Sequence, residues 1–174
     1  EAQRLVTLIG DIIRLSQLDE GVDVPRENCN LLAIAQEAAR DLEPAAEKRN
    51  VSLRVEGDAA QMSGARRLLY EIIYNLCDNA IKYNREGGSV RVRVESREES
   101  VAVSVEDTGI GIAPEHQGRI FERFYRVDKS HSKASGGTGL GLSIVKHAVA
   151  YHNGKIELKS EPGVGTRITV TFPK

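Results

Sequence analysis

The sequence has no apolar run of about 18 residues and no signal-peptide pattern, so we expect that the chain neither spans nor enters a membrane by itself. Its two cysteines, Cys29 and Cys77, stand apart, without the spacing of a metal site or of a disulfide framework. Cys77 lies in an apolar helical pattern, which predicts a small buried hydrophobe and suits a reducing cytosol. Tryptophan, internal repeats and low-complexity segments are also absent.

An excess of charge of either sign is missing as well. The 174 residues include 24 Lys and Arg against 25 Asp and Glu, and the basic residues form no long run. We therefore expect no nucleic-acid partner. A chain of this length can bury one full hydrophobic core and carry a short appendage besides.

The first twenty residues have the pattern of an amphipathic helix. Apolar residues recur at a three-four spacing on one face, and polar residues occupy the other. The apolar positions are Leu5, Leu8, Ile9, Ile12, Ile13 and Leu15, and the polar ones are Arg4, Asp11, Arg14 and Gln17. We predict about five turns of helix that end near Gly21, before a linker marked by Pro25. The pattern leaves open whether the apolar face packs on its own domain or on a partner helix of an antiparallel bundle.

Two further helices and three strands are predicted downstream. A helix over 31–49 has a stripe of Leu32, Ala35, Ala39 and Leu42, and a strand follows over 51–55. A helix over 65–83 has a core stripe of Leu69, Ile72, Ile73, Leu76 and Ala80. Valine alternates over 90–94 and again over 101–105, which predicts two strands paired as a hairpin.

The helix over 65–83 has an unusual polar face. Glu71, Asn75 and Asn79 recur every four residues, and Lys82 and Tyr83 follow one turn later. Asparagine is a poor residue inside a helix because its side chain competes with the backbone for hydrogen bonds. The two asparagines therefore point to a function, whereas we expect Glu71 to lie on a solvated face.

Two glycine turns suggest a nucleotide pocket. Asp107 ends a predicted strand and is followed by Gly109 and Gly111, and a second turn with Gly137, Gly139 and Gly141 opens a helix. A carboxylate fixed at a strand end can accept the exocyclic amine of adenine, and a glycine turn at a helix N-terminus can hold phosphates. Neither turn has the spacing of a P-loop or of the dinucleotide fingerprint.

With these motifs in place, residues 65–174 resemble the catalytic, ATP-binding domain of a sensor histidine kinase of two-component signalling. Its fold is shared with type II topoisomerases, Hsp90 and MutL. The matching segments are the N box at 75–83, the first glycine box at 107–112, the phenylalanine box at 120–128, the second glycine box at 137–142 and the closing hairpin at 160–166.

The resemblance implies an α+β fold, a two-layer α/β sandwich in which a mixed sheet lies under helices, preceded by an amphipathic helix. Residues 1–21 resemble the second helix of the family's dimerisation and phosphoacceptor hairpin, which favours the bundle. Residues 22–30 would be a linker and first strand, and 31–174 the catalytic domain. The first hairpin helix, with its phosphorylatable histidine, has no counterpart here, because His116, His131, His147 and His152 lack the family's His-Glu/Asp setting.

The resemblance also implies roles for the N-box residues. Asn79 would coordinate Mg²⁺, assisted by Asn75, through neutral oxygens that suit a cation whose charge the phosphates balance. Related ATPases have a water-activating glutamate at position 75, and an amide cannot act as a base, so we expect slow ATP hydrolysis. Lys82 would contact the phosphates, and Tyr83 would cover the adenine.

For the glycine boxes, the resemblance implies that Asp107 reads the adenine amine, with the Thr138 hydroxyl nearby. Gly109 and Gly111 would permit the turn. The second box would bring backbone amides to the phosphates from Gly137, Gly139, Leu140 and Gly141. In a mobile lid over 122–136, Arg126 would stabilise the γ-phosphate, with Arg123 and Lys133 as weaker candidates and aromatic residues that dock on the hairpin.

The implied function is transfer of the γ-phosphate of Mg·ATP to a histidine on the hairpin, with Lys82 and Arg126 as catalytic residues. The implied partners are ATP and ADP, the hairpin of the same kinase and the receiver domain of a response regulator. The parent would be a homodimer, and this part of it a cytoplasmic domain of a bacterial sensor anchored in the plasma membrane. Alternatives are a serine kinase acting on a regulator of sigma factors, a module that binds ATP without transferring it, and a hydrolytic ATPase.

Overall fold

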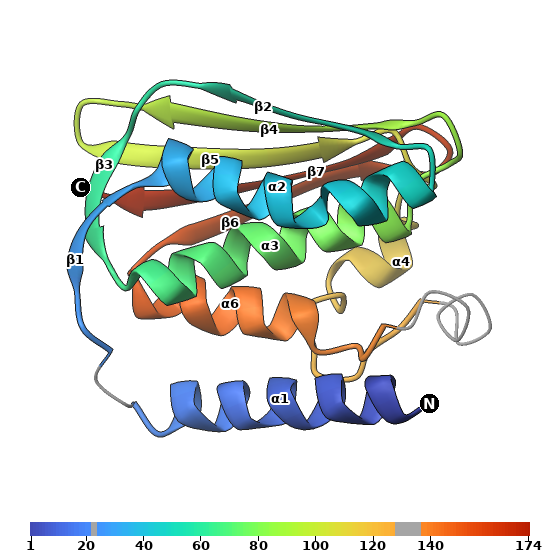
Figure 1. Cartoon of the computed structure of the whole chain (residues 1–174), viewed down its shortest axis with the longest axis horizontal. Coiled ribbons are helices and arrows are strands. Elements are labelled where there is room, and N and C mark those ends of the chain that lie inside the picture. Colours follow the sequence, from blue (N-terminus) through green and yellow to red (C-terminus); the bar gives the residue numbers. More distant parts are fainter. Residues whose placement is uncertain (22–23, 128–136) are drawn as a thin grey trace.

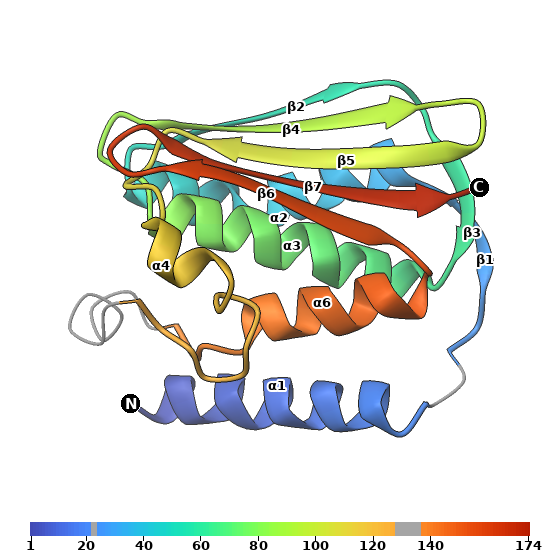
Figure 2. The same cartoon turned by 180° about the vertical axis from the view of Figure 1, so that it is seen from behind.

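The computed structural model describes residues 1–21, 24–127 and 137–174. Helices α2, α3 and α6 cover one face of a sheet, and α1 lies on the far side of α6 (Figures 1 and 2). The helices are α1 (Ala2–Asp19), α2 (Leu31–Lys48), α3 (Arg66–Lys82), α4 (Pro114–Gln117) and α6 (Gly141–Tyr151). The strands are β1 (Glu27–Asn30), β2 (Ser52–Gly57), β3 (Gln61–Gly64), β4 (Ser89–Ser96), β5 (Ser100–Asp107), β6 (Lys155–Glu161) and β7 (Gly165–Pro173).

The main sheet has five strands in the order β2-β4-β5-β7-β6, and β1 pairs with β3 in a separate ribbon. Strand β2 runs parallel to β4, whereas the other neighbours in the main sheet are antiparallel. The predicted two-layer sandwich with a mixed sheet is confirmed, as is the β4–β5 hairpin. Strands β2 and β6 form the edges of the main sheet, and charged side chains are frequent along both.

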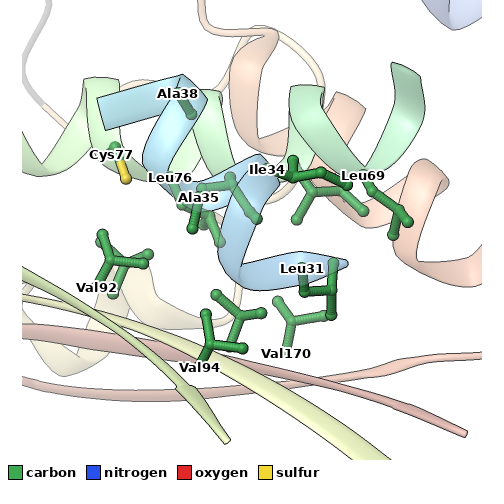
Figure 3. Packing of buried hydrophobic residues seen from close by; sticks show 14 of the residues in the cluster. Leu31, Ile34, Ala35, Ala38, Leu69, Leu76, Cys77, Val92, Val94 and Val170 are labelled. Atoms are coloured by element: carbon green, nitrogen blue, oxygen red, sulfur yellow. The ribbon is translucent and has the colours of Figure 1, made fainter. Parts of the chain in front are cut away.

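The core lies between the sheet and the helices (Figure 3). The alternating valines of β4 and β5 are buried against the helices, and so is the whole predicted stripe of α3. Each buried Val, Leu or Ile side chain in this set stabilises the fold by about 1.5–3 kcal/mol. Cys77 is completely buried in this core, as predicted, and burial raises the pKa of its thiol to about 12.

The stripe predicted for α2 was only partly correct. Ile34, Ala35 and Ala38 are buried, whereas Leu32 and Ala39 are half-buried at its margin. The buried series begins at Leu31, whose amide donates to the carbonyl oxygen of Ala60 at 2.9 Å. This anchor places the first residue of the helix inward and rotates the buried face relative to the sequence-based prediction.

Helix α1 contacts the rest of the chain through an unexpected face. Leu15 is buried with Leu140 and Ile144, Leu8 packs at the margin of this cluster, and Asp11 is also buried. Most of the predicted apolar stripe remains 45–58% exposed, namely Leu5, Ile9, Ile12 and Ile13, and Val6 is more exposed still. The docking face therefore combines Leu8 and Leu15 with the polar Asp11, while the rest of the predicted apolar face stays exposed. Among the helices of the described ranges, none is long and apolar enough to cross a membrane.

His152 joins the C-terminus of α6 to the N-terminus of α3. Its side chain is buried, its Nε2 accepts the Ala65 amide hydrogen at 3.0 Å, and its Nδ1 lies 2.7 Å from the Ala148 carbonyl oxygen. Because Nε2 must be the acceptor, the ring is neutral and Nδ1–H donates. Burial lowers the pKa of this imidazole below its usual value, and the hydrogen bond to Ala148 opposes the shift.

This neutral histidine predicts acid sensitivity of the fold. The unfolded chain takes up a proton at His152 as the pH falls below about 6.5, whereas the folded chain resists it, so stability is lost in that direction. Urea unfolding at pH 7.5 and pH 5.5 is expected to show a loss of about 1 kcal/mol attributable to this group. The loss should be absent from His152→Gln, and an equal pH dependence in both chains would contradict the prediction.

Candidate nucleotide site

A cavity of about 1010 Å³ lies among α1, α3, the end of β5 and the turn before α6. Most of the predicted site residues line it, namely Asn75, Asn79, Lys82, Tyr83, Asp107, Gly111, Arg126, Gly137, Thr138, Gly139 and Gly141. Two do not. Gly109 donates its amide hydrogen to the Asp107 carboxylate, and the Leu140 side chain is buried with Leu15 and Ile144. The structure thus brings together residues that are up to 66 positions apart in the chain (75 to 141).

Asp107 is held so that one carboxylate oxygen remains available. Its Oδ1 accepts the amide hydrogens of Gly109 at 2.8 Å and of Thr166 at 3.3 Å. Its Oδ2 accepts no hydrogen bond from any described residue, and the side chain lines the cavity. Burial raises the pKa of Asp107, and the two amide hydrogen bonds oppose that rise. The free oxygen suits a ligand N–H donor such as an exocyclic amine.

A threonine that sequence reasoning passed over lies beside this carboxylate. Thr166 of β7 pairs in register with Asp107 of β5, lines the cavity, and makes a 2.7 Å hydrogen bond to the Ser160 hydroxyl. Thr138, which was predicted to lie near Asp107 around the adenine, donates its hydroxyl hydrogen to Asp11. The Gly165-Thr166 pair in the closing hairpin was the sequence feature that could have identified this threonine. Its place beside Asp107 follows only from the strand order, in which β7 lies next to β5.

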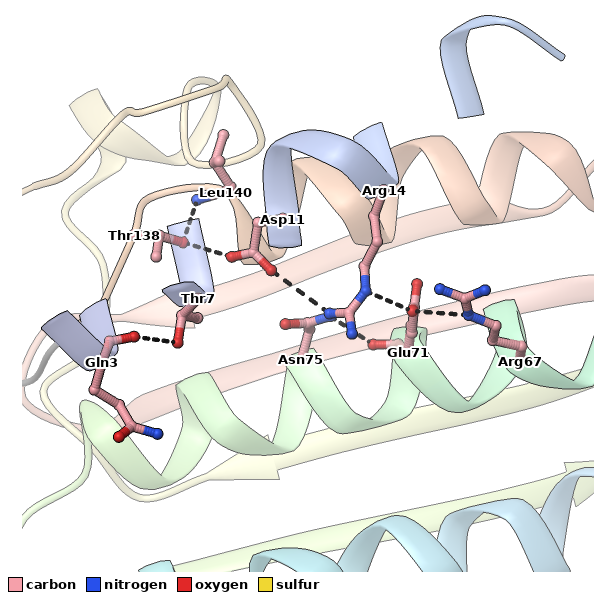
Figure 4. A network of polar contacts seen from close by, with 9 residues as sticks. All are labelled: Gln3, Thr7, Asp11, Arg14, Arg67, Glu71, Asn75, Thr138 and Leu140. Carbon is pink, nitrogen blue, oxygen red and sulfur yellow. Dashed lines mark hydrogen bonds and ion pairs between the residues drawn. The ribbon is translucent and has the colours of Figure 1, made fainter. Parts of the chain in front are cut away.

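The asparagine face of α3 is turned toward the cavity. Asn75 donates from Nδ2 to the Glu71 carbonyl oxygen at 2.8 Å (Figure 4), and its Oδ1 faces Gly141. A Cβ atom at Gly141 would lie only 3.1 Å from that oxygen, which explains a glycine where α6 approaches α3. The Asn79 side chain makes no hydrogen bond within the described ranges. Lys82 pairs with Asp78 at 2.8 Å.

The side-chain oxygens of Asn75 and Asn79 fit an Mg²⁺ ion that is also bound by phosphates. Asn75 and Asn79 offer two neutral amide oxygens on one face of a helix, one turn apart. Among the described residues, no group of three His, Cys, Asp or Glu side chains could hold a metal ion. Because the two amide oxygens carry no charge, a cation held by them would take balancing negative charge from a bound ligand, as Mg²⁺ does in nucleotide sites.

The expectation that Glu71 lies on a solvated face was wrong. Its side chain is only 9% exposed and lies between Arg14 of α1, at 3.1 Å from Nε to Oε1, and Arg67, at 3.6 Å (Figure 4). Burial raises the pKa of Glu71, and the two arginines oppose the rise. The face is buried because α1 packs across it, a long-range contact that the local pattern of α3 does not reveal.

A backbone contact joins the first part of the predicted lid to the second glycine turn. The Phe124 amide donates to the Gly139 carbonyl oxygen at 2.9 Å. Arg126 lines the cavity, whereas Arg123 pairs with Asp19 of α1. Lys133 lies outside the described residues, as do Asp128, His131 and Gly136.

Comparisons with known proteins agree with this geometry. Residues 64–174 match the family described as histidine kinase-, DNA gyrase B- and HSP90-like ATPase. The chain is 40% identical to the sensor-like histidine kinase SenX3 of Mycolicibacterium smegmatis, over all of this chain and 46% of that protein. It is 37% identical to the phosphate regulon sensor protein PhoR of Pseudomonas aeruginosa, over 99% of this chain and 39% of PhoR. The chain thus spans less than half the length of these relatives.

A solved structure supports the same relationship. The crystal structure of full-length ShkA in complex with AMPPNP superposes with a TM-score of 0.86 at 25% identity. The match covers 97% of this chain and 35% of ShkA. The similarity therefore extends over almost all of the chain, beyond the residues that the family description matches.

Proposed function

The chain belongs to the histidine kinase-, DNA gyrase B- and HSP90-like ATPase family, and on that premise we propose that it is the ATP-binding, phosphate-donating domain of a sensor histidine kinase. One observation carries the proposal. A carboxylate with a free oxygen, two amide side chains and a glycine turn at a helix N-terminus converge on a single cavity. Together they match the amine of adenine, a phosphate-bound Mg²⁺ and the phosphates themselves.

Different residues of the cavity would bind the base, the Mg²⁺ ion and the phosphates of ATP. Asp107 accepts the adenine amine at Oδ2, with Thr166 beside it, and Tyr83 covers the base. Asn75 and Asn79 would hold Mg²⁺, which when bound neutralises phosphate charge and helps to orient the γ-phosphate. Lys82 and Arg126 add positive charge, and Gly137, Gly139 and Gly141 offer backbone amides near the start of α6.

The same residues favour transfer to a protein over hydrolysis. Asn75 cannot remove a proton from water, because an amide is not a base at neutral pH. The γ-phosphate is therefore kept for an acceptor, which we propose to be a histidine on a helical hairpin whose second helix is residues 1–21. The exposed apolar residues of α1, including Leu5, Ile9 and Ile12, leave a face for the partner helix.

The remaining roles follow from this assignment. We propose that residues 31–174 form the catalytic domain, that the parent dimerises through a four-helix bundle, and that the phosphohistidine passes its phosphoryl group to an aspartate of a response regulator. This domain would work in the cytoplasm as part of a membrane-anchored bacterial sensor. A module that binds ATP without transfer is the second candidate, since the acceptor histidine is not among these residues.

Phosphotransfer to the hairpin tests the proposal. The chain is mixed with the hairpin of its own parent, γ-labelled ATP and Mg²⁺, and we expect an acid-labile, base-stable label on the hairpin. Asn79→Ala should reduce the labelling rate at least about a hundred-fold, because the metal-bound phosphates lose a ligand. Asn28→Ala, at an exposed position on β1, should label normally. Nucleotide binding without any label would favour the binding module.

A further inference from the structure

Helix α1 contributes a buried carboxylate to the wall of the nucleotide cavity. Asp11 is 9% exposed and lines the cavity together with Thr7 and Arg14 of the same helix. Its Oδ2 accepts the hydroxyl hydrogen of Thr138 at 2.8 Å, and its Oδ1 lies 3.6 Å from Nη1 of Arg14 (Figure 4). A helix outside the catalytic domain therefore holds a residue of the second glycine turn directly.

This carboxylate lies where an anion is favoured. The hydroxyl oxygen of Thr138 also accepts the amide hydrogen of Leu140 at 3.3 Å, and Leu140 immediately precedes the first residue of α6. Asp11 is thus separated from the N-terminus of an 11-residue helix by a single hydroxyl group. Helix N-termini stabilise negative charge, and in the proposed function the phosphates of ATP would lie at this one.

We propose that Asp11 sets the affinity of the site for nucleotide phosphates: docked α1 places a negative charge at the phosphate-binding turn and thereby weakens triphosphate binding. The inference rests on the proposed function and assigns to it a residue that lies outside the catalytic domain. Asp11 competes with the phosphates both for the Thr138 hydroxyl and for the favourable field at the start of α6. By thermodynamic linkage, bound triphosphate weakens the docking of α1 by the same factor.

The surrounding charges leave Asp11 able to act in this way. Arg14 is shared between Asp11 and Glu71, and its contact with Glu71, at 3.1 Å, is the shorter one. Glu71 has a second partner in Arg67. The four side chains together are neutral, so removing the charge of Asp11 leaves a net positive charge beside the phosphates. In a partly buried setting, one unit charge at this range is expected to change triphosphate affinity about ten-fold.

Calorimetric titration with adenosine, ADP and AMPPNP, each with Mg²⁺, tests the inference on this chain and on Asp11→Asn. Asparagine keeps the shape and an oxygen that can accept from Thr138, and it removes the negative charge, with an NH₂ group in place of the oxygen that faces Arg14. We expect AMPPNP to bind the variant about ten times more tightly, ADP to gain less, and adenosine to bind both chains equally. Glu20→Gln, which removes an exposed charge just after the end of the same helix, should match the unmodified chain.

The outcomes separate this inference from the proposed function. Equal AMPPNP affinities in the two chains would overturn the role of Asp11 while leaving the nucleotide site intact. A gain of the same size for adenosine and AMPPNP would also overturn it, because it would indicate general loosening of α1. Absence of nucleotide binding in every variant would overturn the proposed function, and the inference with it. Circular dichroism would verify that Asp11→Asn is folded before the titrations.

Discussion

Asp107→Asn is expected to change the preference of the site from adenine toward hypoxanthine. The new side chain can keep its oxygen on the amides of Gly109 and Thr166, and it then presents an NH₂ group where the free carboxylate oxygen was. With ATP, this NH₂ group and the adenine amine would both be hydrogen-bond donors and could not pair. With ITP, the carbonyl oxygen of hypoxanthine would accept a hydrogen bond from the NH₂ group. We expect the ATP-to-ITP affinity ratio to fall by at least about a hundred-fold, measured by competition against a fluorescent nucleotide.

The adjacent acid provides a control for the loss of charge. Glu106→Gln removes a carboxylate from the next residue of the strand, which is exposed on the opposite face of the sheet and pairs with Arg167 at 3.6 Å. Its ATP-to-ITP ratio should not change. A parallel decrease for ATP and ITP in Asp107→Asn would mean that the carboxylate supports the turn without reading the base.

Gly165→Ala is expected to damage the fold and the site together. Gly165 has a φ of +151°, and a Cβ atom there would lie 2.0 Å from the carbonyl oxygen of Asp107, so β5 and β7 would have to separate. The free energy of unfolding should fall by about 3 kcal/mol, because a backbone atom cannot move aside as a side chain can. Urea unfolding would measure this loss, and ATP affinity should fall with it because Asp107 moves.

Gly163 offers a matched control two residues away in the same turn. It also has a positive φ, of +79°, but nothing lies within 4 Å of the position of its Cβ atom. Gly163→Ala should therefore cost only about 1 kcal/mol, the penalty for a left-handed conformation without a clash. Equal losses at the two positions would show that backbone strain, and not the contact with Asp107, determines the effect.

The local patterns of the sequence predicted the parts of the fold that depend on neighbouring residues. The alternating valines of β4 and β5 and the whole core stripe of α3 are buried as expected, because each reflects one face of a single element. Most of the residues that the glycine and asparagine motifs identified likewise line the cavity. Asparagine is disfavoured inside a helix, and glycine is favoured where a turn comes close to a ligand, so the spacing of these residues indicates a binding site without a structure.

The parts that were missed depend on contacts between distant segments. Thr166 reaches Asp107 only because β7 pairs with β5, and Glu71 is buried only because α1 crosses it. Asp11 falls on the polar side of an amphipathic pattern, which normally faces solvent, yet it is buried beside the docked Leu8 and Leu15. No periodicity within α1 distinguishes a polar face that meets water from one that meets Thr138 and Arg14.

The edges of the main sheet have a consequence for how the protein behaves at high concentration. An exposed edge strand can accept a strand from another molecule and so begin aggregation. Here Lys155, Glu157 and Lys159 project along β6, and Arg54 and Glu56 along β2. Docking of a further strand would force these charges against a neighbouring chain and out of water. The sheet is thereby protected from growing across molecules, although it is open at both sides.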